Sequence, residues 1–383
     1  MRPRALVVLP EAAYPVMGGG PLRTASILEW LRERYELSAI HFSLAGETDP
    51  VGAYPEGMFG EVLRLELPRH DKGMRAKVWR NAKRAMRGVT PLVDRFGGRD
   101  REIGEWVRGR RWDLVWVEHF WGAQYGELLR GAGERLVLDL HNVESAYYES
   151  LERTAPASLL WRRFAGCSRR EERRWLAGFD RLVVTSEADA AKVKGRRVSV
   201  VPNTTPWRER IEVAPREWAV VFSGNFAYAP NQLGLKWFLA EVWPKVIEEE
   251  PELRLRLVGK EVECAPAGGR NVDRVGPVED AVAEIARARV AVAPIRSGSG
   301  TRLKILEAFA AGVPVVSTGL GAEGLRLRGE VVVADEGRAF AEAIVGLVRD
   351  EDRQRALGEA GRRLYEQEYN WRSAWKALDL LEL

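Results

Sequence analysis

The chain of 383 residues contains only two cysteines and four histidines, which limits the sites that it can build. Cys167 and Cys264 lie far apart in the sequence, and neither belongs to a pattern with metal-ligand spacing. This scarcity argues against a disulfide framework and against a zinc cluster. Because no group of His and Cys has ligand spacing, we expect no metal at the functional site.

Long hydrophobic runs are also absent. The apolar run near the N-terminus, residues 5–9, is too short for a secretory signal, and no stretch approaches the ~20 residues of a transmembrane helix. We therefore expect a cytoplasmic protein. The formal net charge of +4 is too small to predict a nucleic-acid partner, although the first half of the chain is basic and the second mildly acidic.

Short apolar runs alternate with helical patterns along the whole chain, which is typical of βαβ units with parallel strands covered on both faces. The strands that we predict are 5–9, 37–42, 113–118, 135–141, 181–186, 198–203, 218–224, 253–259, 290–295 and 313–318. The strand at 253–259 alternates Leu with Arg, which predicts one exposed face. A turn-rich segment, 202–217, separates the two halves.

Two Rossmann-like, doubly wound α/β domains are therefore expected, at residues 1–206 and 207–365. In this architecture ligands bind at the carboxyl ends of the strands, so both crevices should face one central cleft. A C-terminal helix at about 366–383, apolar at Trp371 and Trp375, is expected to pack back on the first domain.

One loop in the second half has the features of an anion site. The segment 294–308, PIRSGSGTRLKILEA, passes from Ser and Gly into an amphipathic helix that opens with Arg302 and Lys304. Cations at a helix start oppose the helix dipole by about 0.3–1 kcal/mol unless an anion lies beside them. The N–H groups of the loop can turn toward such an anion, and Glu307 can accept hydrogen bonds from ribose hydroxyls. The pattern predicts a bound nucleotide diphosphate; the alternative is an exposed loop before an ordinary helix.

Two common nucleotide-binding motifs are missing. No Lys-Ser or Lys-Thr pair follows G-x-x-x-x-G, which argues against a P-loop. No G-x-G-x-x-G lies at a strand-to-helix turn, which argues against a dinucleotide oxidoreductase. The acidic triplet 350–352 lies between two helical patterns, so we expect a solvated helix cap there and no metal site.

Several short motifs occur in an order that resembles a known family. They are GGG (18–20), DLHNVES (139–145), VVTSEAD (183–189), VSVVPN (198–203), FSGNFAYAPN (222–231), RVGPVED (274–280) and GTRLKILEAFAAGVPVVST (300–318). In this order the chain resembles the retaining nucleotide-sugar glycosyltransferases of family 4, which have the GT-B fold, and especially their bacterial polysaccharide branch. The resemblance covers nearly the whole chain, and the last motif is the most specific.

The resemblance implies a donor site. Glu307 matches the family's ribose-binding glutamate, and Arg302 and Lys304 fall where relatives carry cations that face the diphosphate and stabilise the leaving phosphate. The residues assigned in this way to the nucleotide sugar are Gly20, Gly224, Asn225, Val278, Gly298, Ser299, Gly300, Thr301, Arg302, Lys304 and Glu307.

The resemblance also implies a catalytic histidine and an acceptor side. His141 ends the strand whose histidine faces the donor sugar in similar enzymes, and we expect it to act with Arg302 and Lys304. Strand ends and the N-terminal glycine loop supply the expected acceptor side, which is Gly18, Gly19, Glu118, His119 and Asn142. The alternative for the histidines is a hydrogen-bonded structural role.

The sequence departs from the family at two places. Ser299 stands where many relatives carry a glutamate that contacts the transferred sugar. The loop 224–234 carries Asn and Tyr where an Arg and a Lys are usual, so more of the diphosphate charge should rest on Arg302 and Lys304.

These observations predict an enzyme that moves a hexose from a UDP- or GDP-sugar to a glycan or lipid-linked acceptor, with retention of anomeric configuration. The setting implied by the resemblance is synthesis of cell-surface polysaccharide or glycolipid, and no cofactor is expected. Two alternatives remain open: a sugar-nucleotide epimerase of the same fold, and a non-catalytic protein that binds nucleotide sugars.

The segment 69–88 is a basic amphipathic pattern. Met74, Val78, Ala82 and Met86 recur at helical spacing with Trp79 beside them, while Lys and Arg fill most other positions. Each cation near an anionic leaflet contributes about 1 kcal/mol to binding. We expect residues 72–87 to make peripheral contact with the inner face of an anionic cell membrane; the alternative is a domain helix whose apolar stripe is buried.

Overall fold

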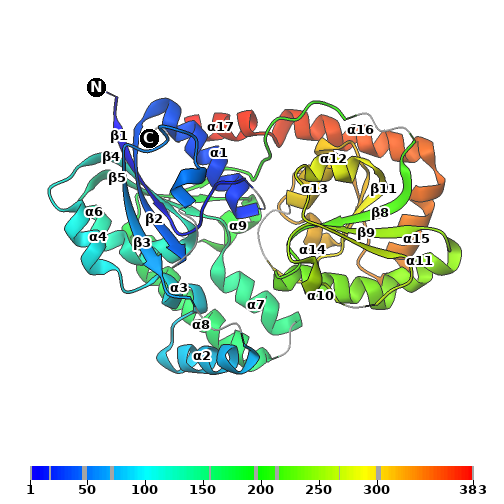
Figure 1. Cartoon of the computed structure of the whole chain (residues 1–383), viewed down its shortest axis with the longest axis horizontal. Coiled ribbons are helices and arrows are strands. Elements are labelled where there is room, and N and C mark those ends of the chain that lie inside the picture. The colour runs from blue at the N-terminus through cyan, green and yellow to red at the C-terminus, as the bar shows by residue number, and fades with distance from the viewer. Residues whose placement is uncertain are drawn as a thin grey trace. The chain divides into compact units, whose positions relative to one another are not determined.

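The computed structural model of the chain describes residues 2–16, 19–44, 50–69, 73–154, 157–193, 197–211, 215–266, 268–298 and 303–381. The chain divides into two compact units. Unit 1 consists of residues 1–202 and 375–383, and unit 2 consists of residues 203–374. Each unit contains one sheet with helices packed around it (Figure 1).

Unit 1 contains a seven-stranded sheet in the order β3-β2-β1-β4-β5-β6-β7, and all neighbouring strands are parallel. The strands are β1 (Arg4–Leu9), β2 (Glu36–Leu44), β3 (Glu61–Leu67), β4 (Trp112–Glu118), β5 (Gly133–Leu140), β6 (Arg181–Val184) and β7 (Val198–Val200). The direction of winding reverses between β1 and β4. In doubly wound sheets ligands bind at such a reversal, beyond the carboxyl ends of the strands.

Helices cover both faces of this sheet (Figure 1). The helices of unit 1 are α1 (Gly19–Arg34), α2 (Met74–Arg87), α3 (Pro91–Phe96), α4 (Asp100–Val107), α5 (His119–Gly122), α6 (Gly126–Arg130), α7 (Glu144–Thr154), α8 (Ser158–Trp175) and α9 (Glu187–Lys192), with short turns η1 (Pro50–Ala53), η2 (Ala123–Tyr125) and η3 (Leu176–Gly178). Helix α2 contacts α3 and α8 and does not cover the sheet. Helix α1 starts within the glycine triplet and is the first helix after β1 in the chain. Its first turn contains no acidic residue, so its N–H groups are not neutralised from within the helix.

Unit 2 contains a six-stranded parallel sheet in the order β10-β9-β8-β11-β12-β13. The strands are β8 (Glu217–Ser223), β9 (Arg254–Val258), β10 (Val272–Gly276), β11 (Ala288–Ala293), β12 (Val315–Ser317) and β13 (Val331–Val333). The helices are α10 (Ala229–Trp237), η4 (Phe238–Val242), α11 (Trp243–Glu249), η5 (Val262–Cys264), α12 (Ala281–Ala286), α13 (Leu303–Ala310), α14 (Gly319–Ala322), α15 (Gly337–Arg349) and α16 (Glu351–Glu368).

The core of unit 2 lies on both faces of its sheet. Along β8, Val220 and Phe222 belong to one apolar cluster, while Ala219 and Val221 belong to another. Successive side chains of a strand point to opposite faces, so both faces of this strand are covered. A strand that is buried on both faces has a continuous run of apolar residues. The strands of this sheet could therefore be predicted from the apolar runs of the sequence. The expected α/β fold with two doubly wound sheets is confirmed.

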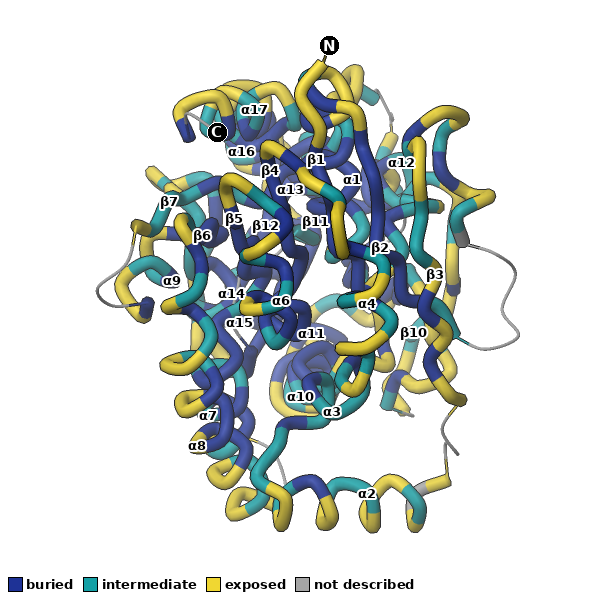
Figure 2. The backbone as a smooth tube through the Cα atoms, turned by 90° about the vertical axis from the view of Figure 1, so that its left-hand side faces the viewer, coloured by how far each residue is buried: buried dark blue, intermediate teal, exposed yellow. Residues whose placement is uncertain are grey.

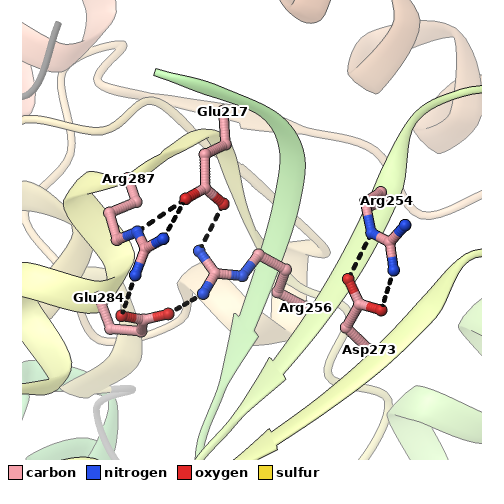
Figure 3. A network of polar contacts seen from close by, with 6 residues as sticks. All are labelled: Glu217, Arg254, Arg256, Asp273, Glu284 and Arg287. Carbon is pink, nitrogen blue, oxygen red and sulfur yellow. Dashed lines mark hydrogen bonds and ion pairs between the residues drawn. The ribbon is translucent and has the colours of Figure 1, made fainter. Parts of the chain in front are cut away.

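Strand β9 corrects one expectation. Its Leu-Arg alternation predicted an exposed face, but Arg256 is only 8% exposed. The Arg256 guanidinium contacts Glu284 of α12 and donates to Glu217 of β8 at 2.9 Å, while Arg254 pairs with Asp273 of β10 (Figure 3). A buried cation requires such partners, and the sequence pattern does not reveal partners on other elements.

The C-terminal helix begins later than expected. Helix α16 ends at Glu368 and α17 (Trp371–Asp379) follows, because the Asn370 amide donates to the carbonyls of Tyr365 and Glu366 at 3.2 and 2.8 Å. At the other end of α16, Asp350 accepts from the Arg353 N–H at 2.9 Å, so the expected helix cap is confirmed.

Among the described residues no helix is long and apolar enough to span a membrane.

Candidate functional site

Polar side chains of unit 1 gather at the carboxyl ends of β4 and β5. The two strands pair in parallel, with Glu118 opposite Asp139, so Glu118 and His141 emerge at the same edge of the sheet. The sequence predicted Glu118, His119 and His141 as site residues, and the structure brings the three together. Asn142 follows His141 in a half-buried bend.

Glu118 and His141 form a buried hydrogen-bonded pair. The Glu118 Oε2 atom lies 2.7 Å from His141 Nε2 and accepts a second bond from the Thr24 hydroxyl at 2.9 Å. Its Oε1 atom accepts from the Trp116 indole at 2.7 Å. Burial disfavours the charged form of Glu118, but the hydrogen bond and attraction from His141 outweigh burial and lower the pKa of the carboxyl. The carboxylate is therefore ionised at neutral pH and fixes the orientation of the His141 ring.

A second buried pair lies beside the first. The Arg23 guanidinium of α1 donates to both Asp139 oxygens at 2.7 and 2.6 Å and to the Val201 carbonyl at 2.8 Å. Both side chains are almost fully buried. The sequence analysis missed Arg23, Thr24 and Asp139. The sequence does contain a signal for Asp139, because it is the single Asp within the apolar run 135–141. A charged residue in a buried strand requires a partner.

His119 adopts a backbone conformation that is uncommon outside glycine. Its φ is +62°, and its ring stacks on Trp121 with 4.4 Å between centroids and lies 3.6 Å from the His141 ring. Burial, together with His141 and Arg23, lowers the pKa of His119 well below its usual range, so the imidazole is neutral at pH 7. Its Nε2 atom is buried and has no hydrogen-bond partner among the described residues. Strain and an unpaired polar atom together are characteristic of functional sites.

The start of α1 lies against His119. A Cβ atom placed on Gly20 would be 3.2 Å from a Glu11 carboxylate oxygen and 3.9 Å from His119 Nε2. Without a Cβ at Gly20 the helix N-terminus lies close to His119 Nε2, which is also 3.8 Å from a Glu11 carboxylate oxygen. Gly19 begins the helix, whereas the predicted site residue Gly18 lies outside the described residues.

In unit 2, Lys304 is held beside the loop that follows β8. Its ammonium donates to Asn231 Oδ1 at 2.8 Å, and the Asn231 amide donates to the Asn225 carbonyl at 2.7 Å. The ammonium also lies 5.1 Å from the centroid of the Phe222 ring. A Cβ atom on Gly224, whose φ is +150°, would lie 2.9 Å from the Asn231 amide nitrogen and 3.4 Å from the Lys304 ammonium. Only glycine leaves the space beside the ammonium open.

Glu307 lies one turn along α13 from Lys304. Its carboxylate accepts a bond of 3.4 Å from Ser223, the last residue of β8, which the sequence analysis did not select. Burial raises the pKa of Glu307 to about 7, against the opposing effect of Lys304. A carboxylate of this kind can accept hydrogen bonds from hydroxyl groups, and each such bond favours its charged form.

Several predicted donor residues lie outside the described part of the chain, namely Ser299, Gly300, Thr301 and Arg302. Gly298 precedes them with φ of +100°, a conformation that favours glycine. Val278, predicted to contact the base, follows β10 and packs against the apolar cluster that includes Leu306 of α13.

Two described groups could be considered for metal binding. Ligand atoms of Glu118, Asp139 and His141 lie within 4.8 Å of one another, and the other group is the exposed set Glu261, Glu263 and Cys264. In the first group Arg23 occupies both Asp139 oxygens, so a metal ion would face a guanidinium. The geometry supports a hydrogen-bonded acid and imidazole pair.

Comparison with known families assigns both units. Residues 18–204 match the family described as "Glycosyl transferase 4-like domain", and residues 217–350 match the family "Glycosyl transferases group 1". A relative described as "Uncharacterized 44.6 kDa protein in cps region" of Klebsiella pneumoniae is 25% identical over 365 residues, which are 89% of this chain and 90% of the relative.

Solved structures share the fold. Sucrose-phosphate synthase from Thermosynechococcus elongatus is 18% identical with a TM-score of 0.71, and the match covers 99% of this chain and 98% of that chain. Anabaena HepE, solved in complex with UDP and glucose, is 14% identical with a TM-score of 0.64 over 98% of both chains. At these identities the likeness shows the fold alone.

Proposed function

The chain belongs to the group 1 glycosyltransferases and uses a nucleotide sugar, and from this premise we propose its reaction. It moves a hexose from a UDP- or GDP-sugar to a glycan or lipid-linked acceptor, with retention of anomeric configuration. The reaction serves synthesis of cell-surface polysaccharide or glycolipid in the cytoplasm. The relative described as a protein in a cps region supports the setting, and retention follows from the resemblance to family 4.

Unit 2 is the donor side of this proposal. The observation that carries it is the placement of Lys304, whose ammonium is oriented by Asn231 beside Gly224. A preoriented ammonium stabilises the charge that grows on the leaving phosphate, together with Arg302. Glu307 accepts hydrogen bonds from the ribose, and the loop residues from Gly298 to Thr301 bind the diphosphate. The leaving phosphate oxygen takes the proton of the acceptor, so no separate base is required.

Unit 1 is the acceptor side and also supplies the proposed catalytic histidine. Glu118 orients His141 toward the transferred sugar, and the buried Arg23–Asp139 pair fixes that end of β5. His119 Nε2 hydrogen-bonds an acceptor hydroxyl, because it is buried without a partner among the described residues. Gly18, Gly19 and Asn142 border the acceptor, and Gly20 faces the donor. In domain terms, residues 1–206 with about 366–383 form the acceptor side, and residues 207–365 bind the donor.

Incubation of the purified chain with UDP- and GDP-sugars tests the proposal. Nucleotide released only when a glycan or lipid-linked acceptor is present supports transfer. An epimerised sugar nucleotide would indicate an epimerase instead. Binding without turnover across the acceptor panel would favour a non-catalytic protein.

A peripheral membrane contact is the remaining part of the proposal. Residues 72–87 touch the inner face of an anionic membrane, where a lipid-linked acceptor would be found. The support is the composition of α2, which contains six Lys or Arg and no acidic residue.

A further inference from the structure

Helix α2 exposes its apolar side chains. Val78, Trp79 and Met86 are 62%, 64% and 71% exposed, and at 100° per residue they fall on one side of the helix. Arg84 lies on the opposite side and is 8% exposed. Figure 2 shows α2 exposed or half-buried along most of its length. The alternative interpretation of this segment, a domain helix with a buried apolar stripe, is therefore wrong.

Polar contacts hold α2 in this orientation. Arg84 and Arg87 pair with Asp94 of α3, each at 2.8 Å. From α8, Arg163 donates to the Ala85 carbonyl at 3.1 Å and Arg170 donates to the Gly88 carbonyl at 2.6 Å. The helix is thus attached through its charged side, and Val78, Trp79 and Met86 remain exposed. Such an arrangement leaves a contiguous apolar strip at the surface, which marks an interaction site in folded proteins.

Positive charge surrounds the apolar strip. Arg75, Lys77, Arg80 and Lys83 form no ion pair within the described part of the chain, and α2 contains no acidic residue. Leu159 of α8 is 80% exposed and lies one turn before Arg163, on the face of α8 that contacts α2. We give the name α2–α8 surface to the residues on the exposed apolar side, which are Arg75, Val78, Trp79, Lys83, Met86 and Leu159.

We propose that the α2–α8 surface docks on an anionic lipid bilayer, with Trp79, Met86 and Leu159 entering the interface and with Arg75 and Lys83, which lie on the same side of α2, facing the headgroups. A basic amphipathic helix with a Trp on its apolar side is suited to this boundary. A second copy of the chain would present the same positive charge and be repelled. A nucleic acid would use the cations but not the exposed apolar side chains. The inference develops the proposed membrane contact and does not depend on the transfer reaction.

Vesicle binding tests the inference. The full chain should sediment with vesicles containing phosphatidylglycerol and not with pure phosphatidylcholine, and binding should fall as salt rises. We expect Arg75→Glu with Lys83→Glu to weaken binding at least about tenfold, because each cation contributes about 1 kcal/mol. The matched control, Arg338→Glu with Arg363→Glu on exposed helices of unit 2, should bind like the unmodified chain.

Insertion of the apolar side chains into the bilayer is tested by fluorescence quenching. Brominated lipids should quench part of the tryptophan fluorescence of the chain, and Trp79→Phe should abolish that quenching while keeping vesicle binding. Trp79→Ala with Met86→Ala should weaken binding about tenfold or more, whereas Val333→Ala, an exposed apolar residue of unit 2, should not.

Four results would overturn the inference: no sedimentation with anionic vesicles, equal sedimentation with neutral ones, undiminished binding of the Trp79→Ala and Met86→Ala variant, or quenching that Trp79→Phe leaves unchanged. A mass in light scattering that falls from dimer to monomer in that variant would assign the surface to a second copy. Glycosyl transfer to a water-soluble acceptor is measured in parallel. If the unmodified protein shows no glycosyl transfer in this assay, the proposed reaction is contradicted, but the membrane inference is not affected.

Discussion

Arg23 and Asp139 form a buried ion pair whose members are separated by 116 residues in the chain. Removing one charge of such a pair leaves the other buried without compensation, which costs about 3–5 kcal/mol. We therefore expect Asp139→Asn to lower the free energy of unfolding of the chain by about that amount, measured by urea denaturation. Arg101→Gln, which breaks the exposed pair with Glu105, should change it by less than about 1 kcal/mol. Equal effects of the two substitutions would show that the buried pair does not stabilise the site.

Glu307 gives a prediction on nucleotide binding. Since burial raises its pKa to about 7, its ionised fraction increases between pH 6 and 8, and ribose hydroxyls bind the ionised form. Affinity for a nucleoside diphosphate should therefore rise across this range. Glu307→Gln should weaken binding at pH 8 by about 1.5–3 kcal/mol and flatten the pH dependence, as measured by titration calorimetry. Titration of the phosphates is common to both proteins and cancels in the comparison. Identical affinity and slope would refute the assignment of Glu307 to the ribose.

Sequence patterns identified single site residues better than the partners of those residues. Glu118 and His141 were predicted because they end parallel strands, and Lys304 because it opens a helix after a glycine-rich loop. Thr24 and Arg23 were not predicted. Thr24 bonds to Glu118, which is 94 residues away in the chain, and Arg23 bonds to Asp139, which is 116 residues away. Contacts of that separation depend on how α1 lies over β4 and β5, which no local pattern encodes.

At the scale of elements, α7 and α8 bury three carboxyl groups. Glu144 accepts from the Trp121 indole at 3.0 Å, and burial, with Glu171 and Glu172 nearby, raises its pKa to about 7. Burial also raises the pKa of Glu171 and of Glu172. A raised pKa means that the folded state holds protons that the unfolded state has lost above about pH 4.3. The stability contributed by this helix pair should thus fall as the pH rises from about 4.3 to 7.

Glu144→Gln isolates this effect, because the amide oxygen can still accept from Trp121 and carries no charge at any pH. We expect the variant to exceed the unmodified chain in unfolding free energy at pH 8, by up to about 3 kcal/mol, and to equal it near pH 4.5. Glu127→Gln on α6, an exposed position, should differ by less than about 0.5 kcal/mol at both pH values. A Glu144→Gln protein that loses stability with pH as steeply as the unmodified chain would contradict this prediction.

The elements themselves were predicted where a single period dominates. Apolar runs identified the buried strands, and the 3.6-residue period identified α2. The orientation of α2 did not follow from its period, because its charged side docks through Asp94, Arg163 and Arg170 on other helices. The same limit applies to β9, where Arg256 is buried by partners on β8 and α12.

At the scale of the whole molecule, alternation of strands and helices predicted two doubly wound sheets, because parallel strands need a crossover helix between them. At this scale we propose that unit 2 binds a nucleotide diphosphate against the Lys304 ammonium. Ligand binding to the folded chain is read directly from its thermal stability.

The most direct test compares melting temperatures of the unmodified chain and Lys304→Met with and without UDP or GDP. A nucleotide at about 100 times its Kd should stabilise the unmodified chain by about 2.7 kcal/mol. Methionine keeps the apolar stem against Phe222 and removes the charge, so the free variant should melt close to the unmodified chain. Losing a cation from a phosphate site costs about 2–5 kcal/mol of binding, so at the same nucleotide concentration the stabilisation should fall below about 1 kcal/mol in Lys304→Met and persist in the control Lys236→Met. A shift that survives undiminished in Lys304→Met would place the diphosphate elsewhere and contradict the account.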